Sequence, residues 1–272
     1  MIIEELLKKG FEELEYIDEG VLKTRMLLAD VLDCHKEYLI THNEDKVDIK
    51  SKRKFFKGID RLKQGEPIQY VLEKAEFYGL EFYVNKNVLI PQPDTEILVG
   101  EVLENFSNKK EILDLCTGSG AIAISINKNI KDARVFASDI SKKALKVAIK
   151  NAEKYKLDIV FIKSDLFENI YKKFDLIVSN PPYIETDFLK KLPSEVKFEP
   201  ILALDGGKDG LDFYRKIIKK SKEHLKENGV LALEIGFDQK DAVMNLMKEE
   251  NFKDVYGKKD YGGNDRIVVG KI

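Results

Sequence analysis

The chain has 272 residues, of which 43 % are hydrophobic and 10 % aromatic, enough to bury the core of one large domain or of two. Its 46 basic and 48 acidic residues leave a net charge of −2, which excludes a general electrostatic field for attracting nucleic acid. No apolar run is long enough to cross a bilayer, and the N-terminus does not resemble a signal sequence. The two separated cysteines and three scattered histidines suggest neither a disulfide framework nor a metal site. We therefore expect a cytoplasmic protein.

Residues 1–70 show apolar side chains at helical spacing and none of the alternation typical of strands. A basic segment, KSKRKFFKGIDRLK, lies at residues 50–63 and could contact RNA. The spacing of its apolar residues favours instead a helix with a solvated basic face and an inward apolar face. We therefore predict a small helical domain over residues 1–70.

Residues 71–90 carry the signals of a β-hairpin. The segment EFYGLEFYVNKNVL is rich in aromatic and β-branched side chains, and Gly79 and the Asn-Lys-Asn at residues 85–87 are turn signals. We predict that this hairpin links two domains. The next segment, PQPDTEILVGEVLENF, opens with two prolines and an Asp-Thr-Glu cluster, which is typical of the start of an amphipathic helix.

Strand-like runs and helical stretches alternate from residue 91 to residue 272. The runs are EILDLC, RVFASD, DIVFIK, FDLIVS, VLALEIG, FKDVYG and RIVVGKI. This alternation predicts an α/β domain over residues 91–272, with a doubly wound, mostly parallel sheet of seven strands. Only a short turn separates the last two runs, so we expect a hairpin there and an antiparallel final strand.

A glycine-rich turn follows the first strand of this sheet. Glycine there lets a ligand approach the backbone closely, beside free N–H groups at the start of the next helix. Asp139 ends the second strand about 20 residues on, where a carboxylate can bind ribose hydroxyls or can cap the helix that starts at Ser141. These features favour a nucleotide-type cofactor over a turn without a ligand, but they do not separate a nicotinamide enzyme from a methyltransferase. The turn consists of Cys116, Thr117, Gly118, Ser119 and Gly120.

The fourth strand, FDLIVS, ends at Asn180, Pro181, Pro182 and Tyr183. Ligands of open α/β sheets bind outside the carboxyl ends of the strands, so this tetrapeptide should face the same crevice as the glycine turn. A planar nitrogen is a poor nucleophile, and it needs acceptors for its two N–H groups if it is to attack a methyl group. The Asn180 oxygen and a proline carbonyl can accept these hydrogens, and Tyr183 can pack on the planar group. This chemistry favours methyl transfer over hydride transfer and over a merely proline-stiffened turn.

The turn DLCTGSG, the strand end SDI and the Asn-Pro-Pro-Tyr tetrapeptide together resemble class I S-adenosylmethionine-dependent N-methyltransferases, which have a Rossmann-like sheet. Adenine-N6 nucleic-acid enzymes share these motifs. Three further segments, at residues 65–99 (GEPIQYVLEKAEFYGLEFYVNKNVLIPQPDTEILV), 198–211 (FEPILALDGGKDGL) and 233–239 (LEIGFDQ), are similar to the release factor glutamine methyltransferases, the HemK/PrmC family. The resemblance covers essentially the whole chain.

The resemblance implies N5-methylation of the glutamine in the Gly-Gly-Gln motif of peptide chain release factors 1 and 2, with S-adenosyl-L-methionine as the methyl donor. It also implies that the helical domain helps to hold the release factor, without a membrane or direct nucleic-acid partner. The residues implied to hold the glutamine and to carry catalysis are Asn180, Pro181, Pro182 and Tyr183. The residues implied to contact the cofactor are Cys116, Thr117, Gly118, Ser119, Gly120, Asp139, Asp165, Leu166 and Asn180.

The chain departs from the pattern of that family at three positions. Cys116 replaces a glycine, Gln92 replaces an arginine, and Leu166 occupies a site that is often aromatic in relatives. No histidine pairs with Cys116 in the sequence, so we do not expect the thiol to act as a nucleophile. Glu199, in the Phe-Glu-Pro segment, is either functional or the cap of a turn.

Two other functions are compatible with parts of the sequence. An adenine-N6 nucleic-acid methyltransferase would explain the Asn-Pro-Pro-Tyr tetrapeptide, but the net charge and the lack of a basic recognition domain disfavour it. A noncatalytic binding module on a methyltransferase scaffold would bind the cofactor without turnover.

Overall fold

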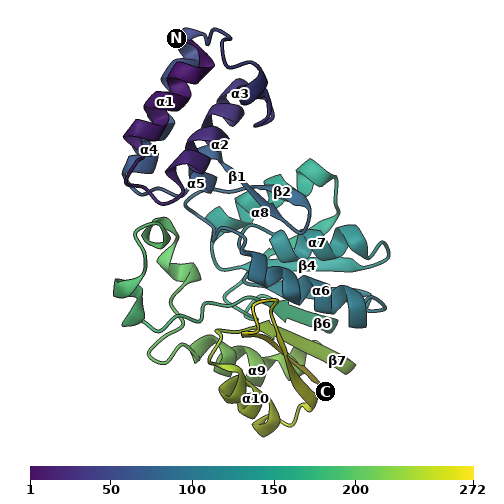
Figure 1. The fold of residues 1–272 in the computed structure, drawn as a ribbon. Coiled ribbons are helices and arrows are strands. Elements are labelled where there is room, and N and C mark those ends of the chain that lie inside the picture. Colours follow the sequence, from purple (N-terminus) through teal and green to yellow (C-terminus); the bar gives the residue numbers. More distant parts are fainter. The chain divides into compact units, whose positions relative to one another are not determined.

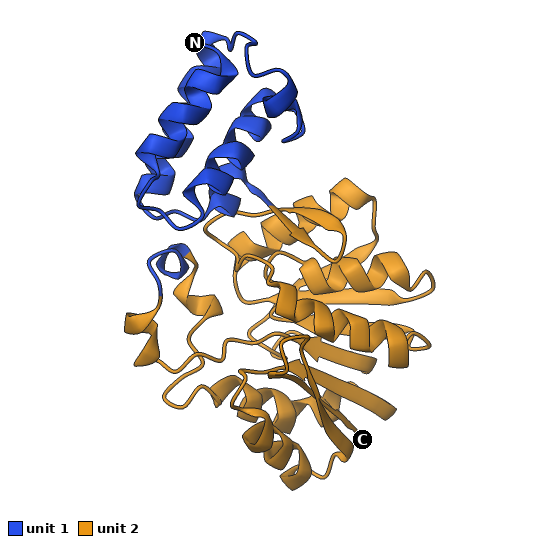
Figure 2. Cartoon of the chain, viewed as in Figure 1, with its two compact units in different colours: residues 1–74, 193–198 blue, residues 75–192, 199–272 orange.

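The computed structural model describes all residues, 1–272, which form two compact units (Figure 2). The first comprises Met1–Lys74 and Pro193–Phe198, and the second comprises Ala75–Leu192 and Glu199–Ile272. None of the helices is both long and apolar enough to span a bilayer.

The first unit is helical, as the sequence predicts (Figure 1). The basic segment forms the helix α4, in which Phe55, Ile59 and Leu62 are buried and most of the lysines are exposed, so the prediction of an inward apolar face is confirmed. The Nζ atom of Lys23 lies 2.6 Å from Oε1 of Glu195, which ties residues 193–198 to these helices. The helices are α1 (Ile3–Glu13), α2 (Gly20–Leu32), α3 (Tyr38–Thr41), α4 (Ile49–Lys63) and α5 (Ile68–Leu72).

The predicted hairpin is formed by β1 (Lys74–Phe77) and β2 (Leu80–Tyr83). Residues 71 and 72, which we place in the hairpin from the sequence, belong to the end of α5. After the hairpin, the short helix η1 (Pro93–Thr95) leads directly into α6 (Glu96–Asn105). The proline at the first position of η1 and the acidic first turns of both helices are the start signals that the sequence contains.

The second unit is built on a seven-stranded sheet in the order β5-β4-β3-β6-β7-β9-β8. All neighbouring strands from β5 to β7 are parallel, and β9 pairs antiparallel with both β7 and β8, so the predicted fold class is confirmed. The strands are β3 (Glu111–Leu115), β4 (Arg134–Asp139), β5 (Ile159–Lys163), β6 (Phe174–Ser179), β7 (Leu225–Glu234), β8 (Lys253–Lys259) and β9 (Asp265–Lys271). The helices between them are α7 (Ala121–Asn129), α8 (Lys142–Tyr155), α9 (Asp212–His224) and α10 (Lys240–Glu249), and the short helices η2 (Phe188–Lys191) and η4 (Ile201–Ala203) precede α9. The short helix η3 (Val196–Phe198), between η2 and η4 in the chain, belongs to the first unit.

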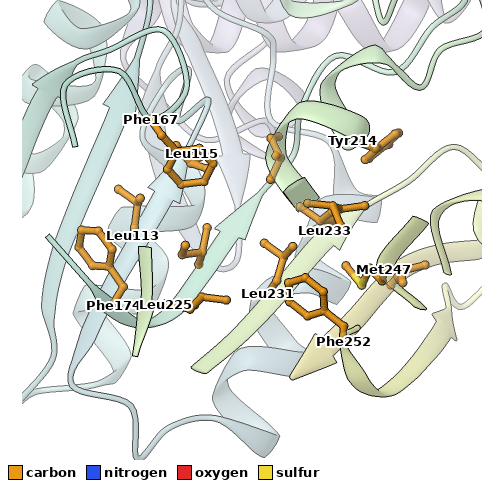
Figure 3. Close-up of a cluster of buried hydrophobic side chains, with 14 of the residues drawn as sticks. Leu113, Leu115, Phe167, Phe174, Tyr214, Leu225, Leu231, Leu233, Met247 and Phe252 are labelled. Atoms are coloured by element: carbon orange, nitrogen blue, oxygen red, sulfur yellow. The ribbon is translucent and has the colours of Figure 1, made fainter. Parts of the chain in front are cut away.

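Side chains alternate between the two faces of this sheet. Leu113 and Leu231 face α9 and α10, where they join Tyr214 and Met247 in one buried apolar cluster (Figure 3). The opposite face packs against α6 and α7, since α6 contacts β7 and β9 and α7 contacts β3 and β4. Both faces are therefore covered, which explains why the strands read as nearly continuous apolar runs.

The chain reverses its direction of travel across the sheet between β3 and β6. It runs outward from β3 through β4 to β5, and then returns to place β6 on the other side of β3. At such a point the connections after the two strands diverge to opposite sides, which leaves a crevice at their carboxyl ends.

Glu199 anchors the segment before α9 to the segment before η1. The residue is only 8 % exposed, and its Oε2 accepts a hydrogen bond from the backbone N–H of Ile90 at 2.9 Å. Burial raises the pKa of Glu199 to about 7, although the N–H of Ile90 acts in the opposite direction. Glu199 therefore connects two segments that are far apart in the chain, and it does not cap its own turn.

Gly10 and Gly100 should respond in opposite directions to substitution by alanine. A Cβ at Gly10 would lie 2.4 Å from Cγ2 of Thr24. Thr24 is buried, and its hydroxyl donates a hydrogen bond to the carbonyl of Gly20, so it is held in place. A Cβ at Gly100, by contrast, would meet nothing within 4 Å. We expect Gly10→Ala to destabilise the helical unit by about 1–3 kcal/mol and Gly100→Ala to stabilise α6 by up to about 1 kcal/mol. Calorimetric unfolding measures both, and a Gly10→Ala variant as stable as wild type would contradict this packing.

Glu199→Gln should gain stability relative to wild type as the pH rises. Between pH 4.5 and about 7 the folded state keeps a proton on Glu199 that the unfolded state has released, so ionisation costs wild-type stability across this window. The glutamine keeps the acceptor for Ile90 and has no charge to bury. We expect the difference in unfolding free energy to grow by up to about 3 kcal/mol from acid to neutral pH. A difference that is constant between pH 4.5 and 8 would refute the proposed protonation of Glu199.

Candidate active site

A cavity of about 330 Å³ opens at the carboxyl ends of β3, β4, β5 and β6, within the second unit. It lies where the sheet topology predicts a crevice, because β3 and β6 are neighbours and the chain reverses between them. Nine of the residues singled out from the sequence line it: Cys116, Thr117, Gly118, Ser119, Asp139, Asp165, Leu166, Asn180 and Pro182.

The glycine-rich turn is held in a left-handed backbone conformation at three positions, with φ values of 60° at Cys116, 55° at Gly118 and 82° at Gly120. A Cβ at Gly118 would meet nothing within 4 Å, so this glycine leaves open space beside the backbone. Gly120 does not line the cavity. Its missing Cβ would lie 3.1 Å from Cβ of Ala148, so Gly120 allows α7 to pack closely on α8.

Asp139 links the turn to the end of β4. Its Oδ2 accepts a hydrogen bond from the N–H of Gly118 at 2.9 Å, and its Oδ1 accepts one from the N–H of Ser141 at 2.8 Å. The cap of α8 is the Ser141 hydroxyl, which accepts from Ala144, so Asp139 is not the helix cap. Burial raises the pKa of Asp139, while the two N–H groups favour its ionised form. Each carboxylate oxygen retains a lone pair with which it can accept a further hydrogen bond.

Asp114 supports the turn from beneath. Its Oδ2 accepts hydrogen bonds from the Thr117 hydroxyl at 2.6 Å and from the N–H of Ala123 at 3.2 Å, while Oδ1 is buried without a partner. Burial raises the pKa of Asp114 to about 7. The sequence motif contains this residue, but its spacing alone does not show that it accepts hydrogen bonds both from the turn and from the first turn of α7.

The Cys116 thiol is unsuited to nucleophilic chemistry. Burial raises its pKa well above the usual range, and the carboxylate of Asp139 acts in the same direction. The thiol therefore stays protonated at neutral pH. Its φ of 60° is in the left-handed region, which glycine adopts more readily than cysteine.

Asn180 lies on the cavity wall with a defined amide orientation. Its Nδ2 donates a hydrogen bond to Oγ1 of Thr95 at 3.1 Å, which leaves Oδ1 as an acceptor. The β6–β3 pairing sets Ser179 opposite Leu115, and the Ser179 hydroxyl donates to the Leu115 carbonyl at 2.7 Å. Asn180, the residue after β6, therefore lies beside the carboxyl end of β3, where the glycine turn starts.

Of the other three residues of the tetrapeptide, only one lines the cavity. Pro182 lines the cavity, whereas Pro181 and Tyr183 do not. The Tyr183 side chain faces Glu234, and burial raises its pKa well above the usual range. The predicted packing of its ring on a planar ligand therefore requires a ligand that reaches beyond the residues that line the cavity.

The segment that follows the tetrapeptide packs directly on its backbone. A Cβ at Gly206 would lie 2.6 Å from Cα of Tyr183, and one at Gly210 would lie 2.4 Å from its carbonyl oxygen. The Gln239 side chain donates to that same carbonyl at 3.0 Å and accepts from the N–H of Gly236 at 2.9 Å. The glycines and Gln239 thus fix the backbone course of the tetrapeptide.

Several lining residues are not among the site residues predicted from the sequence. Ile140 follows Asp139 directly, so its position at a strand end could have indicated it. Thr95 belongs to the helix-start cluster, and this local role conceals its contact with Asn180. Gln92 also lines the cavity, and its Nε2 donates to the carbonyl of Ile90 at 3.0 Å. Further lining residues are Phe77, Val88, Pro200, Leu202, Ala203, Phe213 and Lys216.

Comparison with known proteins assigns a family to both parts of the chain. Residues 92–192 match the model of the methyltransferase small domain, and residues 5–72 match that of the PrmC N-terminal domain. A solved methyltransferase from Pyrococcus furiosus is 16 % identical with a TM-score of 0.56, and the match covers 82 % of this chain and 98 % of that one. At this identity the likeness shows the fold alone.

Two relatives match over almost their full lengths, and both are named release factor glutamine methyltransferase. That of Clostridium acetobutylicum is 44 % identical over 99 % of this chain and 98 % of its own, and that of Clostridium botulinum is 42 % identical over 100 % and 99 %. The chain therefore belongs to the family of release factor glutamine methyltransferases.

Proposed function

We propose that this protein transfers a methyl group from S-adenosyl-L-methionine to the side-chain nitrogen, N5, of the glutamine in the Gly-Gly-Gln motif of release factors 1 and 2, in the cytoplasm. The observation that carries the proposal is the orientation of the Asn180 amide. Its nitrogen donates to Thr95, so its oxygen is left as an acceptor beside the cavity at the end of the sheet. The names of the full-length relatives support the substrate class.

The cavity residues suit the proposed cofactor, which supplies an electrophilic methyl group when bound. The Asp139 carboxylate is held by two backbone N–H groups and retains lone pairs for ribose hydroxyls. The open space at Gly118 allows close approach to the backbone of the turn. Asp165 and Leu166, at the end of β5, are assigned to the adenine end. The complete proposed cofactor set is Cys116, Thr117, Gly118, Ser119, Gly120, Asp139, Asp165, Leu166 and Asn180.

The proposed catalytic role of the tetrapeptide is to position a weak nucleophile. Oδ1 of Asn180 and a proline carbonyl of the tetrapeptide accept the two N–H groups of the glutamine amide, which turns the nitrogen lone pair toward the methyl group. Tyr183 contributes packing at the end of the tetrapeptide. No strong base is needed, because the alkylated nitrogen becomes acidic and loses a proton readily. Positioning and electrostatic stabilisation then provide most of the rate acceleration.

The helical domain is proposed to help hold the release factor. The match of residues 5–72 to the PrmC N-terminal domain supports a role specific to this family. We retain a helical recognition domain over residues 1–70, a hairpin linker over 71–90 and a methyltransferase domain over 91–272.

Purified protein incubated with labelled S-adenosyl-L-methionine should transfer the label to release factor 1 and to release factor 2. Replacing the glutamine of their Gly-Gly-Gln motifs by glutamate should abolish transfer, because a carboxylate offers no amide nitrogen. Adenine-containing DNA and RNA, tested separately, address the alternative that the Asn-Pro-Pro-Tyr tetrapeptide allows. Label in nucleic acid alone would overturn the proposal, and cofactor binding without transfer to any substrate would indicate a binding module.

Asn180→Ala and Asp139→Ala should separate catalysis from cofactor binding. Asn180→Ala removes an acceptor for the glutamine and should lower kcat roughly 100- to 1,000-fold. The cofactor Kd should change by less than about 3-fold, because the other residues of the proposed cofactor set remain. Asp139→Ala removes the ribose acceptor and the tie to Gly118, and should weaken cofactor binding about 10- to 100-fold. Calorimetric titration measures the affinities and single-turnover assays measure the rates. An unchanged rate in Asn180→Ala would refute its positioning role.

A further inference from the structure

Glu234 lies directly beside Asn180 at the edge of the cavity, although 54 residues separate them in the chain. The parallel pairing of β6 with β7 ends at Ser179 opposite Leu233, and Asn180 and Glu234 are the next residues on the two strands. Because side chains alternate along a strand, both point to the face of the sheet that α6 covers. Thr95, the residue immediately before α6, completes the group.

The side chain of Glu234 is buried and has no function in the mechanism described above. It is 1 % exposed, and Oε2 has no hydrogen-bond partner. The hydroxyls of Thr95 and Tyr183 and the charged groups of Arg266 and Asp94 lie close enough to this side chain to influence its ionisation. Arg266 is itself paired with Asp94 and Asp260, each at 3.0 Å. Such a buried carboxylate is costly, so a local role for it is expected.

The Thr95 hydroxyl is the group through which Glu234 can act on Asn180. Its oxygen accepts the hydrogen bond from Nδ2 of Asn180, and its single hydrogen is free to be donated elsewhere. An ionised carboxylate can only accept, so Glu234 offers an acceptor toward which the hydrogen of Thr95 can turn. Without that acceptor, Thr95 could donate to Asn180 instead, and the amide would turn to present its NH₂ group to the cavity.

We propose that Glu234 is a positioning residue which, through the Thr95 hydroxyl, keeps the amide oxygen of Asn180 turned toward the substrate. The inference rests on the proposed function, because the glutamine amide is the group that needs an acceptor there. A reversed Asn180 amide would set its own N–H groups against those of the glutamine. The Tyr183 hydroxyl, at the other end of the tetrapeptide, also lies near this carboxylate.

Three single variants and one double variant test whether Glu234 acts on Asn180 through Thr95, which we call the relay. Thr95→Val removes the hydroxyl at constant shape, Thr95→Ser keeps it, and Glu234→Gln keeps the shape but adds a competing donor. Assays at about pH 8.5 keep the carboxyl ionised, since burial raises the pKa of Glu234 only to about 7. We expect Thr95→Val and Glu234→Gln to lower kcat roughly 10- to 100-fold with an unchanged cofactor Kd, and Thr95→Ser to retain most of the activity.

The double variant distinguishes a relay from two independent structural effects. If Glu234 acts through Thr95, Thr95→Val combined with Glu234→Gln should be no slower than the slower single variant. Losses in kcat that multiply, or full activity of Glu234→Gln, would overturn the inference. Thermal unfolding of each variant shows whether a loss of activity comes from misfolding.

A readout that needs no methyl transfer separates this inference from the proposed function. In protein labelled with ¹⁵N-asparagine, the Asn180 side-chain NH₂ should be protected from hydrogen exchange in wild type and in Thr95→Ser, and exposed in Thr95→Val. Reduced protection in Glu234→Gln would support the relay, and wild-type protection there would refute it. Failure of the wild type to methylate release factors would refute the proposed function, but it would not affect the hydrogen-exchange result for Asn180.

Discussion

The parallel pairing of β6 with β3 is the contact on which the site depends. It sets Leu115 opposite Ser179, while the pairing of β3 with β4 sets Leu115 opposite Ser138. Three strands therefore end at the same level, and the residues that follow them must share one space. The glycine turn, Asp139 and Asn180 converge there because parallel strands bring their carboxyl ends to one edge of the sheet.

Buried carboxyl groups hold this edge together. Burial raises the pKa values of Asp114, Glu199 and Glu234 to about 7. Asp114 bonds to the glycine turn, Glu199 bonds to the backbone of Ile90, and Glu234 faces Thr95 and Tyr183. Each carboxyl reduces stability through its desolvation, while Asp114 and Glu199 each hold a backbone N–H group near the cavity. A site whose chemistry is mainly positioning benefits from such rigid support.

The elements were largely predictable from the sequence, and the contacts between them were not. Helical periodicity located α4 and its buried face, and the strand-like runs located the seven strands and the antiparallel last one. By contrast, Glu199 looked like either a functional group or a turn cap, and it binds Ile90 across 109 residues of chain. Tyr183 lies against Glu234 and outside the cavity lining, which the order of residues in the tetrapeptide does not reveal.

The sequence by itself determined the family, the sheet with its glycine turn, and the residues that follow each strand, because these depend on local spacing and on short motifs. Only the tertiary structure decided the orientation of the Asn180 amide, the packing role of Gly120 and the placement of Thr95 beside Asn180. The physical reason is that a hydrogen bond or a close packing contact depends on two partners. Here the partners come from segments that are brought together only when the sheet forms and its helices cover it.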